Sequence, residues 1–154
     1  MADLTGKTWM AIGETDDPDA VIQSFEAAAA ITKGDPVYLS ADDKVSPAAA
    51  VQNCIGIAVK TVALGVMCPV LMRGRVKVKA GEAIARGNLV YGADASKRVL
   101  LYNGSHTHTE NTAAAYTQNA TTVAADTYPA RKLGLALETT TGADDLLFIF
   151  VAKV

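Results

Sequence analysis

Short apolar runs separated by turn-forming residues recur along most of the chain, and the alternation is clearest at 75–79. There Val76 and Val78 face one way, while Arg75, Lys77 and Lys79 face the other. This period of two is typical of a half-buried β-strand with a cationic outer face. Further strands are expected at 36–39, 53–62, 88–93, 98–102, 132–138 and 144–154. Counting about eight short strands at spacings of roughly 8 to 15 residues, we predict an all-β sandwich or small barrel.

Three segments need separate interpretation. Residues 40–47, SADDKVSP, are interpreted as a polar turn. Residues 65–84 are expected to form two strands, with Gly74 between apolar runs. Residues 21–33, VIQSFEAAAAITK, stay open, since four consecutive alanines and the i, i+4 spacing of Val21 and Phe25 favour a helix, whereas the segment runs directly into a turn and strand.

One phrase occurs twice in the chain. KGDPVYLS at 33–40 and RGNLVYGA at 86–93 place glycine, valine and tyrosine at the same relative positions, 53 residues apart. A glycine-containing strand follows each phrase, CIGIAV at 54–59 and KLGLAL at 132–137. The second copy is longer because it carries the Thr-, Ala- and Asn-rich segment 103–130. Because a lone strand pair cannot bury its apolar face, we predict two related halves packed face to face, with 103–130 as a long inserted loop.

Composition limits the class of protein further. The chain has 154 residues, half of them apolar, and a formal net charge of −2. This fits one folded domain, spanning residues 21–154, and gives no reason to expect direct nucleic-acid binding. No apolar run approaches the roughly 20 residues that cross a bilayer, and the first residues lack the apolar region of a secretory signal, so no membrane association is expected. Cys54 and Cys68 are expected to be buried and reduced.

The first 20 residues are polar and aperiodic, and we interpret them as an extended N-terminal arm. Trp9, the only tryptophan, lies here beside Met10. Two interpretations are open: the two side chains fold back onto the core, or they anchor the arm on a partner, since tryptophan often dominates interface energetics. The second interpretation predicts an arm that reaches away from the barrel and contacts a neighbour.

Candidate chemistry is sparse. The only histidines, His106 and His108, lie in the long loop without an evident third metal ligand. The Asp-Asp pairs at 16–17, 42–43 and 144–145 fall in expected turns, where carboxylates cap backbone groups. No phosphate-binding glycine motif is present. We therefore expect no catalytic, cofactor or metal site, and no enzyme.

The ordered set of motifs resembles the small capsid decoration, or cement, proteins of tailed bacteriophages. The resemblance runs over roughly 25–154 and rests on AAAAITKGDPVYL, IGIAV, RGRVKVKAGEAI, GNLVYGADASKRV, LGLALE and DLLFIFVAKV, in that order. The chain departs from the family pattern at Arg73, where an acidic residue is common, and in the length of 103–130.

The resemblance implies a function and a partner. It implies a β-barrel domain, a homotrimer, made in the host cytoplasm and placed on the outer surface of an icosahedral head, where it binds the major capsid protein. It also implies that 24–32, SFEAAAAIT, is a strand leading into the first turn. Candidate capsid or subunit contacts are Trp9, Met10, Arg75, Lys77 and Lys79. The alternative is a β-barrel module that binds glycan or peptide through the long loop.

Overall fold

The computed structural model describes residues 10–102 and 132–152, and within these residues it contains strands and turns but no helix. The all-β prediction is therefore confirmed. The strands are β1 (Val21–Ala27), β2 (Pro36–Ala41), β3 (Lys44–Pro47), β4 (Cys54–Ala58), β5 (Met67–Lys79), β6 (Leu89–Gly92), β7 (Val99–Leu101), β8 (Gly134–Ala136) and β9 (Leu146–Val151).

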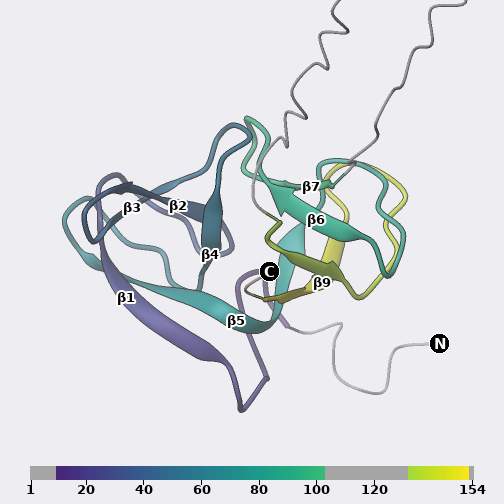
Figure 1. Ribbon diagram of the computed structural model, residues 1–154, viewed down its shortest axis with the longest axis horizontal. Coiled ribbons are helices and arrows are strands. Elements are labelled where there is room, and N and C mark those ends of the chain that lie inside the picture. Colours follow the sequence, from purple (N-terminus) through teal and green to yellow (C-terminus); the bar gives the residue numbers. More distant parts are fainter. Residues whose placement is uncertain (1–9, 103–131, 153–154) are drawn as a thin grey trace, which may run out of the picture.

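The first half of the molecule is a closed five-stranded barrel. Its strands follow the order β1-β3-β2-β4-β5, and pairing between β1 and the start of β5 closes the circuit. Closure leaves no long unpaired edge in this half. The second half continues from the end of β5 in the order β5-β9-β8-β6-β7, and a parallel bridge between Ala80 and Val99 brings β7 back to β5. Figure 1 shows the two halves side by side, joined by β5.

This arrangement corrects two expectations. The halves do not pack face to face as the repeat suggested, because both are built on one shared strand. Residues 67–79 form this single strand of 13 residues, although two strands were expected between 65 and 84. Gly74 lies within it with φ of 131°. The glycine lets the strand turn from one half into the other without ending, because φ in this range strains other residues.

The repeat is visible in the backbone hydrogen bonds. In the first half, the Gly34 N–H donates to the carbonyl oxygen of Ala58 at 2.7 Å. In the second half, the Gly87 N–H donates to the carbonyl oxygen of Ala136 at 2.8 Å. The β-ladder register agrees as well, since Val37 faces Gly56 and Val90 faces Gly134. The two halves therefore share one strand plan, in which the second half of β5 takes the place of β1 and β9 takes the place of the first half of β5.

Both interior glycines of the repeat are required by close backbone approach. A Cβ atom on Gly56 would overlap the carbonyl oxygen of Leu71 on β5. A Cβ atom on Gly134 would overlap the carbonyl oxygen of Phe150 on β9. Glycine within a strand often marks such an approach. The same residue in the same place in both halves indicates that the repeat is structural.

The cores of the two halves use corresponding positions. Eight buried residues fill the first barrel: Ala27, Ile31, Val37, Val45, Ala58, Val62, Cys68 and Val70. Their counterparts in the second half are also buried: Ala80, Ile84, Val90, Val99, Ala136, Thr140, Leu147 and Ile149. Thr140 is the one polar residue among these counterparts. Its hydroxyl accepts the Ile84 N–H at 2.9 Å and donates to the Glu82 carbonyl at 3.1 Å.

Local structure settles the segments left open by the sequence. The strand that the family resemblance implied at 24–32 is confirmed in part. Strand β1 covers Val21–Ala27, where pairing with β5 outweighs helix propensity, and beyond it Ile31 forms only an isolated bridge with Val62. The expected polar turn at 40–47 contains strand β3, so the turn itself is confined to Asp42 and Asp43. At the ends of the inserted segment, the Lys132 Nζ lies 5.1 Å from the Tyr102 ring centroid. The insertion therefore leaves and re-enters the fold at neighbouring points.

Candidate assembly surfaces

The N-terminal segment 10–20 lies against the molecule. The Gly13 N–H donates to the carbonyl oxygen of Lys77 at 2.8 Å, and the Lys77 Nζ donates to the carbonyl oxygen of Met10 at 3.0 Å. The Arg75 Nε donates to an Asp16 carboxylate oxygen at 3.0 Å. The expectation that the whole arm reaches away from the barrel is therefore wrong for residues 10–20. Trp9 lies outside the described residues.

The N-terminal segment contacts two of the three cationic side chains on β5, Arg75 and Lys77, and the third is Lys79. Lys77 is only 9% exposed, and its Nζ lies 5.8 Å from the centroid of the Phe148 ring. Arg75 is half-buried and lies 5.2 Å from the same centroid. Both cations sit over an aromatic face, which stabilises them. Lys79 has an exposed side chain. The three cations thus differ in their availability to a partner, which strict alternation along β5 does not reveal.

Exposed apolar side chains gather in residues 60–67, which run from the connection after β4 to the first residue of β5 and are called here the apolar loop. Leu64 is 69% exposed, Met67 is 55% exposed and Val66 is 47% exposed. The corresponding connection in the second half reads TTTGADDL at 139–146 and is mostly polar. Contiguous exposed apolar side chains often mark interaction sites. The sequence carried this signal in the contrast between the two copies of the repeat, which single-strand patterns do not show.

A second exposed apolar site lies on the outer face of β8 and β9. Leu135 is 38% exposed and faces the partly buried Phe150 across the ladder. The corresponding pair in the first half, Ile57 and Leu71, is fully buried and belongs to the same hydrophobic cluster as the core of the second half. One outer pair is therefore covered within the chain, and its counterpart is open.

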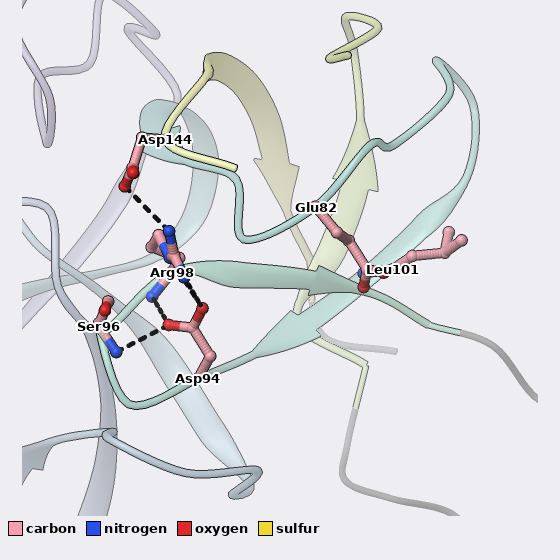
Figure 2. A network of polar contacts seen from close by, with 6 residues as sticks. All are labelled: Glu82, Asp94, Ser96, Arg98, Leu101 and Asp144. Carbon is pink, nitrogen blue, oxygen red and sulfur yellow. Dashed lines mark hydrogen bonds and ion pairs between the residues drawn. The ribbon is translucent and has the colours of Figure 1, made fainter. Parts of the chain in front are cut away.

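Polar contacts hold the turn between β6 and β7 in the second half (Figure 2). The Arg98 Nε donates to Asp94 Oδ2 at 2.8 Å, and Arg98 Nη1 donates to Asp144 Oδ1 at 3.1 Å. The Asp94 Oδ1 accepts the N–H groups of Ser96 and Arg98. Partial burial raises the pKa of Asp94, but these hydrogen bonds and the Arg98 charge outweigh it and hold that pKa below its usual value. The arrangement ties the β6–β7 turn to the β8–β9 connection, so its role is structural.

Sites for small ligands are shallow in the described part of the chain. A groove of about 510 Å³ lies where the first barrel meets the second half, with Val21, Gln23, Leu39, Ile55 and Met72 among its lining residues. Within residues 10–102 and 132–152, no cluster of three or more His, Cys, Asp or Glu side chains could hold a metal ion. His106 and His108 lie outside these ranges. Cys54 and Cys68 are buried free thiols, and burial raises the pKa of Cys54 to about 12.

Comparison with known proteins identifies the family. A family model described as "Phage cement protein" matches residues 47–151. The chain belongs to the phage cement protein family. It is accordingly a capsid-associated structural protein of a phage. No curated protein sequence matches the chain.

A solved structure supports the fold of this cement protein. It is the N base of the head fiber gp8.5 of bacteriophage phi29, which shares 19% sequence identity at a TM-score of 0.52. The match covers 86% of the cement protein chain and 94% of the solved chain. No helix in the described residues is long and apolar enough to span a membrane.

Proposed function

We propose that this cement protein binds the outer surface of an icosahedral phage head as a homotrimer and stabilises contacts between neighbouring major capsid subunits. Family membership supports the capsid association. Binding would act by burying apolar and polar surface across subunit junctions, without turnover. Synthesis in the host cytoplasm followed by attachment to the head is part of this proposal.

The apolar loop is the observation that supports this function best. Its three large side chains are each about half exposed or more, whereas the counterpart connection in the second half has one large apolar side chain, Leu146, which is 43% exposed. Complete burial of such a side chain is worth about 1.5–3 kcal/mol, so burying the exposed part contributes roughly 1 kcal/mol for each residue. Several copies of the loop on one trimer would bind together, and linked sites raise the overall affinity well above that of each site.

The cationic side chains on β5 are proposed as additional capsid contacts beside the apolar loop. Lys79 is the exposed member of the row on β5 and could pair with an acidic capsid surface. Arg75, Lys77 and Met10 make contacts within the chain, so a capsid contact through them would have to use the remaining exposed part of Arg75 or displace residues 10–16. Trp9 stays a predicted contact.

The test compares two exposed aspartate substitutions on equivalent connections. We expect Leu64→Asp, in the apolar loop, to weaken co-sedimentation with heads that lack the protein by at least tenfold. The matched control is Ala143→Asp, which adds the same charge to an exposed position of the polar connection in the second half. Both variants should give the wild-type circular dichroism spectrum. Wild-type head binding by the Leu64 variant would contradict the proposed role of the loop.

A further inference from the structure

Two surfaces of the molecule are open although their counterparts in the repeat are buried. One is the outer face of the second half, and the other is the end of the first half. On the outer face of the first barrel, Ile57 and Leu71 are 0% exposed. They are buried in the cluster that also holds the core of the second half. The equivalent pair on the second half, Leu135 and Phe150, has no such cover within the described residues, and Leu135 is 38% exposed.

The end of the second half around Gly92 and Ala93 packs on the first half. Gly92 lies so close to Cys54 that a Cβ atom there would meet the Cys54 Sγ at 2.7 Å. The Ala93 N–H donates to the Ala50 carbonyl at 3.1 Å, and the Gly92 carbonyl accepts the Gln52 N–H at 3.1 Å. These contacts and the shared cluster form one interface between the halves.

The first half has a corresponding end, but no segment within the described residues packs on this end as the second half packs on the first. Five second-half residues join the shared cluster without belonging to the repeated core: Val76, Val78, Ala93, Leu133 and Val151. Their counterparts in the first half are exposed or only partly buried: Gln23, Phe25, Ser40, Ile55 and Met72. Three of these line the groove of about 510 Å³ together with Leu39, which is 49% exposed and is the counterpart of Gly92. Lys132, Leu133 and Ala152 of the second half also line this groove.

We propose that a second copy of this chain fills the groove, so that the Leu135–Phe150 face of one copy docks on the open end of the first barrel of the next. The contact would repeat between chains the interface already present within the chain. It joins two different surfaces and is therefore heterologous, which produces a closed ring when the rotation between copies closes. This inference specifies the self-association proposed above and rests on it.

Cross-linking between variants that each carry one added cysteine tests the arrangement. One variant carries Leu135→Cys and the other Leu39→Cys, both at exposed positions, and a short bis-maleimide joins thiols that lie close together. The native thiols of Cys54 and Cys68 are buried in each folded copy and should not react. We expect the mixed sample to give cross-linked dimers at least tenfold faster than either variant alone. A chain carrying both substitutions should give covalent multimers.

The control separates this inference from the capsid proposal. Leu135→Asp should lower the sedimenting mass of the purified protein to that of one chain, while Leu64→Asp should leave that mass unchanged and impair head binding. Equal cross-linking of Leu135→Cys alone would overturn the proposal by indicating a twofold contact. Absence of cross-links both in solution and on heads would overturn it as well, whether or not the capsid prediction holds.

Discussion

Replacing Ile57 by alanine tests whether the two halves stabilise each other through their shared cluster. The side chain is 0% exposed and points away from the first barrel's own core, so its loss removes contacts between the halves. Three carbon atoms are deleted, worth roughly 2.4 kcal/mol in transfer free energy at about 0.8 kcal/mol for each buried methylene. The cavity left behind adds to this, and measured costs of such substitutions are about 2–5 kcal/mol.

Urea unfolding followed by circular dichroism gives the free energy of unfolding for each variant. Ile31→Ala, in the first barrel's own core, is the positive control and should cost a similar amount, since Ile31 is 1% exposed. Leu135→Ala, at the counterpart of Ile57, should cost less than about 1.5 kcal/mol at protein concentrations where chains are separate, because that side chain is partly solvated. A cost below about 1 kcal/mol for Ile57→Ala, with the usual cost for Ile31→Ala, would refute the claim that the halves pack on each other through this residue.

Two further predictions concern the repeat and its polar contacts. Gly56→Ala and Gly134→Ala should each destabilise the protein by roughly 1–3 kcal/mol or more through overlap with a neighbouring strand, whereas Gly142→Ala, which has open space, should be nearly neutral in thermal unfolding. Asp94 has a lowered pKa, so its carboxylate stabilises the fold above its unfolded pKa and this stabilisation is lost as pH falls through the folded pKa. Asp94→Asn should therefore flatten the acid side of the stability profile measured by urea unfolding, and an unchanged acid slope would contradict this assignment.

The features that the sequence predicted are those encoded locally or by repetition. Alternation and turn residues indicate strands wherever one face is buried, and the recurrence of Gly56 as Gly134 revealed that one strand plan is used twice. Strand β3 was not predicted because polar residues flank the turn residues Asp42 and Asp43, so the whole of 40–47 has the composition of a turn. The continuity of β5 was missed because a glycine inside an apolar run often ends a strand, whereas Gly74 here redirects one.

The candidate surfaces were less predictable because they depend on contacts between distant segments. Alternation placed Lys77 on the outer face of β5 but could not show that residues 10–13 cover it. The exposure of Leu64 likewise depends on which elements fail to pack against its loop. Such information lies in the tertiary arrangement, so only comparison of the two halves position by position could have drawn attention to the loop in advance.

The shared strand also determines how the molecule can open. β5 supplies a wall to both halves, pairing with β1 and β4 near its start and with β9 near its end. If one half unfolded, the other half would lose the contacts at the interface between them. Its part of β5 would also be attached directly to unfolded chain. Partial opening is therefore costly, and the two halves should melt as a single cooperative unit, with amide hydrogens on both sides of Gly74 exchanging at similar rates.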